Sequence, residues 1–267
     1  MKTNKKILPV ILLIGVGMAF SCKKDKPGMV VKTGDSTTVI IPVPGESGKK
    51  LLPVQLGSGK SKMTFSYTAN HSISKIEYAD GSSTELNYTK TGLPFNLTRY
   101  NSENQMTFTS EYELDGQGRI IRADHYDMSD GDFNIQDYFI PVYTSSSQPS
   151  ALRYYNSAGK LMNELQISYS AGGNRIYDQS KQGNLLISYV YDDKNGLFKN
   201  AGFAWLLAVE KENPLFYSLF NNISTSQNNS YPNENRNFSY TYNADMYPSA
   251  ITITGLTANK VTYQTVN

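Results

Sequence analysis

The most informative segment of the sequence is residues 106–121, which read MTFTSEYELDGQGRII. From Met106 to Leu114, every second residue is apolar or small, and polar Thr and Glu residues stand between them. This period of two is typical of an antiparallel strand with one buried face and one solvated face. Turn-forming residues occupy Asp115 to Gly118, and an aliphatic run begins at Ile120. The segment therefore predicts a β-hairpin.

The same pattern recurs along the chain. All 20 tyrosines lie after residue 66, and six of them close strand-like segments before a polar turn: Tyr67, Tyr88, Tyr112, Tyr143, Tyr169 and Tyr191. Successive members of this set are 21 to 31 residues apart, which is the length of one hairpin with its turns. Short turns leave no room for crossovers. We therefore predict an all-β fold, an up-and-down antiparallel meander of about fourteen strands with one short helical insertion.

A meander of this length is expected to close or curl into a barrel-like sheet, because open edges would pair with other chains. The Tyr, Phe, Leu and Ile positions then fill the interior, and Thr, Ser, Asn and Lys face water. The alternative is a barrel whose apolar face meets lipid. Membrane barrels have longer alternating strands and two aromatic girdles, so we favour the water-facing arrangement.

The N-terminal residues resemble an export signal. Lys2, Lys5 and Lys6 precede an uncharged, mostly apolar run from Ile7 to Ser21 that is too short to span a bilayer comfortably. Ser21 stands directly before Cys22, the single cysteine of the chain. This pairing resembles the lipobox of bacterial lipoproteins, and the resemblance implies that Cys22 is acylated and becomes the first residue of the mature protein. An ordinary signal peptide with an incidental cysteine is the alternative.

The predicted cleavage changes the charge balance. The whole chain has a formal net charge of +2, but the signal region contains three lysines and no acidic residue. Its removal leaves 22 basic against 23 acidic side chains, a net charge of −1. The mature protein therefore lacks the basic character that nucleic-acid binding requires, and we expect no nucleic-acid partner.

The chain divides into three predicted regions. Residues 1–21 form the lipoprotein signal peptide, and residues 22–60, rich in Pro and Gly and without an aromatic residue, form a flexible tether. Residues 61–267 form the repeat-built β domain, in which 198–237 is a helix-containing insertion.

Four short segments resemble known repeats. Residues 112–120, YELDGQGRI, resemble the tyrosine/aspartate (YD) repeats of bacterial Rhs shells. Residues 191–198, 219–223 and 242–248 are similar to recurring segments of a family of uncharacterised Bacteroidetes lipoproteins, a domain of unknown function with a porin-like fold. The resemblance covers about residues 61–267. It implies a barrel-like fold and a location in the cell envelope, and it implies no reaction.

The repeat breaks between Tyr191 and Tyr242. Within this interval, Asn200 is expected to cap a helix spanning Ala201 to Lys211, and Pro214 follows its end. One prediction is that this helix plugs the barrel or covers an open edge. The other is a ligand cleft for sugars or other neutral polar ligands, lined by the aromatic side chains of Trp205, Phe216, Tyr217 and Phe220.

Catalytic and metal-binding patterns are sparse. His71 and His125 are the two histidines, and no hydrolase, metalloprotease or phosphate-loop motif accompanies them. Asp127, Asp130 and Asp132 offer oxygen ligands of the type that Ca²⁺ binds. Their spacing is not that of a helix-loop-helix calcium site, so a solvated turn is the favoured interpretation. We predict no catalytic residue, no cofactor and no metal site.

These observations predict a lipid-anchored envelope protein, placed in the outer membrane and facing either the periplasm or the cell surface. Its partners are expected to be the membrane, through the lipid on Cys22, and a glycan or another envelope protein. A non-catalytic domain that binds a ligand or a partner is the first hypothesis. A structural component that assembles through β-edges or surface contacts is the second, and a glycan hydrolase with carboxylates that the sequence does not single out is the third.

Overall fold

A computed structural model describes residues 30–31, 39–40, 49–128, 133–144, 148–181, 185–210, 213–254 and 258–266. The chain divides into two units, Met1–Val43 and Pro44–Asn267. In the first unit, the two-residue strands β1 (Val30–Val31) and β2 (Val39–Ile40) pair antiparallel. The predicted signal peptide and Cys22 lie outside the described residues.

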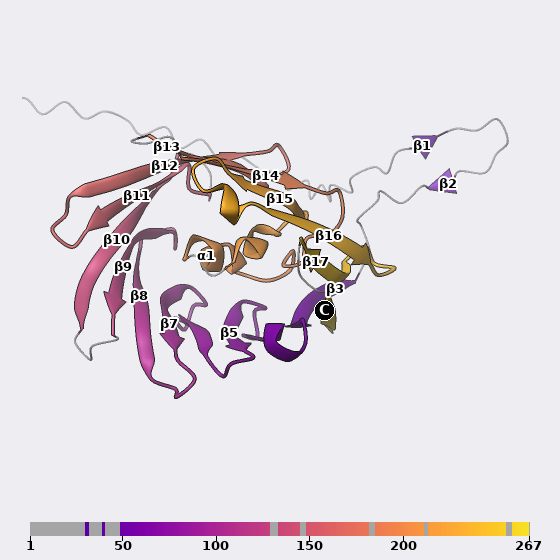
Figure 1. The fold of residues 1–267 in the computed structure, drawn as a ribbon, viewed down its shortest axis with the longest axis horizontal. Helices are drawn as coiled ribbons and strands as arrows, with labels where there is room; N and C mark the ends of the chain where they lie inside the picture. The colour runs from indigo at the N-terminus through magenta and orange to yellow at the C-terminus, as the bar shows by residue number, and fades with distance from the viewer. Residues whose placement is uncertain are drawn as a thin grey trace, which may run out of the picture. The chain divides into compact units, whose positions relative to one another are not determined.

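The second unit is a closed antiparallel barrel of sixteen strands (Figure 1). Its strands are β3 (Lys50–Leu56), β4 (Met63–Tyr67), β5 (Ile73–Tyr78), β6 (Ser83–Tyr88), β7 (Pro94–Tyr100), β8 (Met106–Leu114), β9 (Ile120–Asp127), β10 (Asn134–Val142), β11 (Ala151–Asn156), β12 (Leu161–Tyr169), β13 (Arg175–Ser180), β14 (Leu186–Tyr191), β15 (Ile223–Asn228), β16 (Arg236–Tyr242), β17 (Pro248–Ile253) and β18 (Asn259–Val266). The short helical elements are η1 (Gly59–Ser61), α1 (Ala204–Val209), η2 (Pro214–Tyr217) and η3 (Pro232–Glu234).

Each strand pairs antiparallel with the next one along the chain, and β18 returns to pair with β3 over six residues, from Val261↔Leu56 to Val266↔Lys50. The predicted up-and-down, barrel-like meander is therefore confirmed. The barrel has sixteen strands rather than about fourteen because two of them, β3 and β15, were not predicted. β3 (KLLPVQL) does not alternate and contains Pro53, whereas β15 (ISTSQN) is mostly polar.

These two strands also correct the predicted boundaries. The tether was predicted over 22–60, but Lys50–Leu56 is a barrel strand that pairs with both neighbours. The insertion was predicted over 198–237, but Ile223–Asn228 belongs to the barrel wall. Neither segment shows the period of two on which the sequence prediction relied.

The hairpins share one turn geometry. In eight turns, the first residue donates its N–H to the carbonyl of the fifth, and the fourth donates to the carbonyl of the first: 68–72, 78–82, 89–93, 101–105, 115–119, 156–160, 170–174 and 243–247. The fourth residue has a positive φ, as at Gly118 (77°) and Asn104 (59°). Gly and Asn adopt this left-handed conformation most easily, which explains the Gly- and Asn-rich turns of the sequence.

Tyrosine hydroxyls tie neighbouring hairpins together near the strand ends. Tyr67 Oη donates to the Pro53 carbonyl at 2.5 Å, and Tyr88 Oη donates to the Ile73 carbonyl at 2.6 Å. The same contact recurs from Tyr143, Tyr169 and Tyr240 to carbonyls that lie 23, 20 and 17 residues earlier. The recurrent tyrosines of the sequence therefore serve the architecture first.

The barrel interior is partly filled by the chain between β14 and β15, where α1 and η2 lie within the ring of strands (Figure 1). The ring centroid of Phe198 lies 5.5 Å from that of Phe65 on β4 and 4.7 Å from that of Phe216 on η2. Facing water outside, Lys75 pairs with Glu77 and Glu85 at 3.4 and 3.3 Å. None of the described helices is long and apolar enough to cross a membrane.

The helix differs from its prediction. It begins at Ala204, three residues later than expected, because Phe203 precedes it in the left-handed conformation with φ 59°. Asn200 does not cap it. Its side-chain amide donates instead to the Leu51 carbonyl (3.0 Å) and to Tyr247 Oη (2.8 Å), so this residue fixes the inserted chain to the barrel wall.

Candidate functional site

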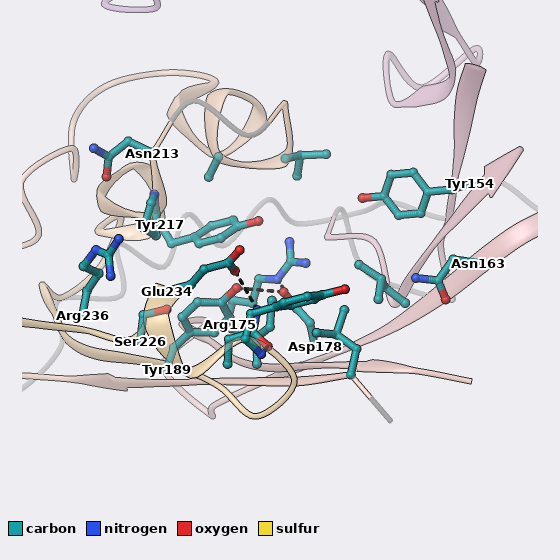
Figure 2. A pocket seen from close by; sticks show the side chains of 18 residues that line it. Tyr154, Asn163, Arg175, Asp178, Tyr189, Asn213, Tyr217, Ser226, Glu234 and Arg236 are labelled. Atoms are coloured by element: carbon teal, nitrogen blue, oxygen red, sulfur yellow. Dashed lines mark hydrogen bonds and ion pairs between the residues drawn. The ribbon is translucent and has the colours of Figure 1, made fainter. Parts of the chain in front are cut away.

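A cavity of about 720 Å³ lies inside the barrel, between the strands β11 to β16 and the α1–η2 segment. Its walls combine tyrosine rings, amides and four charged side chains, which Figure 2 shows converging on one space. Most small-molecule sites have volumes of 300–1,000 Å³ and a few convergent polar groups. This cavity, the "barrel cavity", is therefore the strongest candidate site.

Arg175 and Asp178 of β13 form the polar centre of the barrel cavity. Arg175 Nε donates to Asp178 Oδ1 at 2.5 Å, and the other carboxylate oxygen accepts the Tyr189 hydroxyl at 2.9 Å (Figure 2). Arg175 and Asp178 are 6% and 3% exposed. The Arg175 guanidinium lies 4.7 Å from the centroid of the Tyr217 ring. The pair is thus buried, hydrogen-bonded and oriented by two tyrosines.

A β-bulge brings these two side chains to the same side of the wall. On a regular strand, residues three apart point to opposite faces. In β13 the pairing with β12 moves from Tyr169↔Arg175 to Ser168↔Tyr177, so one residue of β13 is left over. The same register shift recurs beside the turns of six other hairpins, so the bulge belongs to the shared hairpin geometry, and in β13 it re-aims a side chain.

Burial and charge set the titration of the groups in the barrel cavity. Burial disfavours the charge of Arg175, but Tyr217, Asp178 and Tyr189 outweigh it, so the pKa of this guanidinium lies above its ordinary value. Burial raises the pKa of the Tyr154, Tyr189 and Tyr217 hydroxyls well above 10. These hydroxyls therefore remain protonated and serve as hydrogen-bond donors.

A second polar cluster, the "His125 cluster", lines a neighbouring cavity of about 400 Å³ that shares Tyr154 and Val209 with the first. His125 Nδ1 lies 2.5 Å from Asp137 Oδ1, and Nε2 lies 3.2 Å from Glu210 Oε2. The second contact is an ion pair rather than an aligned hydrogen bond, because Nε2 has no hydrogen-bond partner of good geometry. Burial lowers the pKa of His125, but Glu210 and Asp137 outweigh it and raise the pKa above 6.5.

Glu210 joins the end of α1 to the barrel wall. Its Oε1 accepts hydrogen bonds from Ser110 Oγ (2.9 Å) and Tyr112 Oη (3.0 Å), and its side chain is 1% exposed. Its backbone carbonyl accepts from the Arg99 guanidinium at 2.5 Å. Because carboxylates face both nitrogens of His125, this histidine lacks a free lone pair for general-base chemistry. The His125 cluster therefore holds the inserted helix in place.

The sequence-predicted ligand residues are dispersed. Tyr217 lines the barrel cavity, whereas Phe216 is buried in the apolar core beside Phe198. Trp205 is half-buried against the same core. Phe220 is 44% exposed and lies against Gly173, where an added Cβ would meet Phe220 Cε2 at 2.9 Å. The structure thus brings one of these four residues to the candidate site.

The structure describes only one of the three aspartates of the weak metal candidate. Asp127, at the end of β9, accepts a hydrogen bond from Gln136 Nε2 at 2.8 Å. Asp130 and Asp132 lie outside the described residues. Across the part of the chain that the structure describes, no three His, Cys, Asp or Glu side chains are placed to hold a metal ion.

Sequence reasoning missed the central residues of both cavities. Period-two alternation places Arg175 and Asp178 on opposite faces, and the sequence prediction did not include the bulge that follows the 170–174 turn. His125 and Glu210 are 85 positions apart in the sequence, so their pairing depends on the fold. The buried positions of β13 are Arg175, Asp178 and Ser180, so this strand has no apolar inward face by which the sequence could mark it.

Comparisons with known proteins identify neither a family nor a curated relative, because no family model and no curated protein matches the chain. Among solved structures, a porin-like protein from Bacteroides uniformis ATCC 8492 is similar with a TM-score of 0.49 and 12% identity, over 81% of this chain and 95% of that one. A TcdB2-TccC3-Cdc42 structure is similar with a TM-score of 0.31 and 14% identity, over 72% of this chain and 9% of that one. Similarities of this level do not indicate a function.

The barrel itself confirms the fold that the resemblance to porin-like proteins implied. Membership of the Bacteroidetes lipoprotein family stays a prediction, as does the position in the outer membrane.

Proposed function

We propose that this β-barrel binds a small polar ligand in the barrel cavity and does not transform it. The observation that carries the proposal is a cavity of about 720 Å³ inside the barrel, with a buried, oriented Arg175–Asp178 pair at its centre. A buried charged group is costly unless its donors and acceptors are hydrogen-bonded. A polar ligand completes those hydrogen bonds.

Binding is favoured over hydrolysis because the buried carboxylates are already engaged. Asp178 accepts hydrogen bonds from Arg175 and Tyr189, and Glu210 accepts from Ser110 and Tyr112. A general acid needs a proton to give, and a base or nucleophile needs a free lone pair aimed at the substrate. Asp178 and Glu210 line the two cavities but already accept two hydrogen bonds each, which makes them poor candidates for these roles.

The closed barrel disfavours the hypothesis that this protein assembles with others through a free β-edge. The pairs β9–β10 and β18–β3 complete the ring of strands β3 to β18, so this described part of the chain offers no free sheet edge for pairing with another protein. Contacts through the outer surface remain open to this hypothesis.

We also propose that Cys22 carries a lipid anchor. Acylation of Cys22 would hold the barrel at a membrane without a spanning helix. Metabolic labelling of expressing cells with an alkyne fatty acid tests it, with Cys22→Ala as the matched variant. Labelling of both proteins, or of neither, would contradict the anchor.

A cavity-filling variant tests ligand binding directly. Ser226 lines the barrel cavity and is 8% exposed, whereas Ser239 on β16 is exposed on the outer face. The full chain in mild detergent is screened by thermal shift against sugars, sugar acids, amino acids and nucleosides. We expect stabilisation of wild type and Ser239→Phe by the same compounds, and none for folded Ser226→Phe. No stabilising compound, or equal responses of all three proteins, would overturn the proposed function.

A further inference from the structure

The Arg175 guanidinium has more donors than the protein uses. Its Nε is bonded to Asp178 at 2.5 Å, but its Nη1 and Nη2 form no hydrogen bond to any residue that the structure describes. The side chain is nine-tenths buried. Among the described residues, the fully buried side-chain N and O atoms without a hydrogen-bond partner are His125 Nε2, Tyr191 Oη and Tyr263 Oη. Nη1 and Nη2 of Arg175 are not in this set, so they are accessible from the barrel cavity that Arg175 lines. Two N–H groups on one planar edge therefore remain available to a ligand.

Two hydroxyls add to this donor edge. Tyr154 Oη and Tyr217 Oη have no hydrogen-bond partner among the described residues, and both side chains line the barrel cavity (Figure 2). Asn163 contributes a further donor, because its Oδ1 accepts the Ser180 hydroxyl at 2.5 Å and its amide N–H groups are left over. A site rich in donors fits a group that only accepts hydrogen bonds.

The charges around the barrel cavity balance, which disfavours a ligand of high charge. Arg175 and Arg236 contribute two positive charges, and Asp178 and Glu234 contribute two negative ones. The second pair is engaged locally, since Arg236 donates to the Asn233 and Asn235 carbonyls and Glu234 accepts from Asn228. A dianionic phosphate would meet Asp178 without enough positive charge to balance it. A carboxylate matches the planar edge of one arginine and brings a single charge.

The remaining walls suit hydroxyl groups and a ring. The rings of Tyr217 and Tyr189 line the cavity and pack edge-to-face with their centroids 5.5 Å apart, and Ser226 adds a hydroxyl. Aromatic rings beside amides and hydroxyls are suited to a ligand with one apolar face and a polar rim. A sugar ring has this character.

We propose that the ligand of the barrel cavity is a sugar acid whose carboxylate is bound by Nη1 and Nη2 of Arg175, with Tyr154 and Tyr217 as additional donors. Asp178 acts as a positioning residue, because it fixes the guanidinium through Nε and leaves the terminal edge free. This inference rests on the proposed function and names the substrate class of the same site.

Titration calorimetry with D-galacturonate and D-galactose tests it, because the two sugars differ at C6, where one has a carboxylate and the other a hydroxymethyl group. The full chain is used in mild detergent at constant ionic strength. We expect wild type to bind galacturonate about tenfold more tightly than galactose, as a charge-assisted pair implies. Arg175→Lys keeps the charge but loses the planar edge, and it should lower galacturonate affinity about tenfold while leaving galactose affinity unchanged.

Arg153→Lys is the matched control. Arg153 pairs with Glu164 at 2.9 Å on the same barrel, but it does not line the barrel cavity. It should keep the preference of wild type for galacturonate. Equal affinities of wild type for the two sugars, or an unchanged preference in Arg175→Lys, would overturn the inference and leave the proposed function standing. If wild type binds neither sugar, the inference fails, and the Ser226→Phe screen decides the proposed function separately.

Variants that keep the buried ion pair cover the case in which Arg175→Lys does not fold. Tyr154→Phe and Tyr217→Phe remove one donor hydroxyl each and retain the ring. Loss of one hydrogen bond to a charged group should weaken galacturonate binding by about tenfold and galactose binding by less. If both variants bind galacturonate as tightly as wild type does, these hydroxyls do not contact the ligand, and the proposed carboxylate site is wrong.

Discussion

The two sides of the barrel interior share one strand architecture but differ in the polarity of their buried side chains. On β3 to β7, the large buried residues are apolar (Leu52, Leu56, Phe65, Ile73, Ile76, Leu86 and Leu97), and the buried polar ones are small and uncharged (Ser83, Thr84 and Thr98). On β8 to β14, apolar residues are interrupted by Ser110, His125, Arg175, Asp178 and Tyr189. We call these the apolar side and the polar side. The inserted chain contacts both, through Phe198 and Phe216 on one and Glu210 and Tyr217 on the other.

The difference shows where function resides in a repeated fold. Strand order, pairing and turn geometry are the same on the two sides, so none of them creates a site. A site arises where an inward position carries a polar group that the surrounding protein satisfies only in part. Arg175 is such a group, whereas the buried polar residues of β3 to β7 carry no charge.

The largest expected effect comes from the contact between the inserted chain and the apolar side. Phe198 is 1% exposed and packs between Phe65 and Phe216. Phe198→Ala should cost about 4 kcal/mol of unfolding free energy, because it removes buried apolar area and leaves a cavity. Urea unfolding followed by tryptophan fluorescence measures it. Phe220→Ala is the control, since Phe220 is 44% exposed and should change stability by less than about 1 kcal/mol. A similar loss in both variants would mean that the apolar side is not the main source of stability.

The sequence was sufficient to predict most of this frame. Alternation in 106–114 and 161–169 marked strands β8 and β12, and the tyrosines that close strands marked the hairpins. These are local signals, each read within one strand or turn. β3 and β15 were missed because Pro53 and the polar run ISTSQN hide their strand character, although the closed ring requires both.

The site was less predictable because its signals are non-local. Tyr217 was predicted to share a ligand cleft with Trp205, Phe216 and Phe220, and of these four residues only Tyr217 lines the barrel cavity. A single bulge in β13 turns Arg175 toward Asp178. Only the closed barrel places Glu210 beside Tyr112 and His125.

The second prediction tests whether the polar side depends on its charge pairs. Asp178→Ala leaves Arg175 buried without its partner and should cost about 3 kcal/mol, the range seen when one partner of a buried pair is removed. The double variant Arg175→Met, Asp178→Leu should recover most of this loss, because it removes the stranded charge. Equal stabilities of the two variants in urea would show that the ion pair is not what Asp178 contributes. The double variant is also expected to lose galacturonate binding, which separates stability from function on the polar side.

The third prediction concerns pH and has a smaller magnitude. His125 is faced by Asp137 from β10, by Glu210 from the end of α1, and by the rings of Phe108 and Phe139. Glu210 and Asp137 overcome burial and raise the folded-state pKa of His125 above its unfolded value near 6.5. The stabilisation by the imidazolium is therefore complete below about pH 6.5 and is lost as the pH rises through the folded-state pKa.

We expect the urea midpoint of wild type to fall between pH 6 and 9 by the equivalent of about 1.5 kcal/mol, the lower value for hydrogen bonds to charged groups. His125→Gln has no titrating ring, so its midpoint should be flatter over the same interval. The measurement starts at about pH 5.5, above the range in which carboxylates titrate. If wild type and His125→Gln lose stability in parallel, the His125 cluster does not hold α1 through charge. The apolar contacts of Phe198 and Phe216 would then account for the position of the inserted chain on both sides of the barrel.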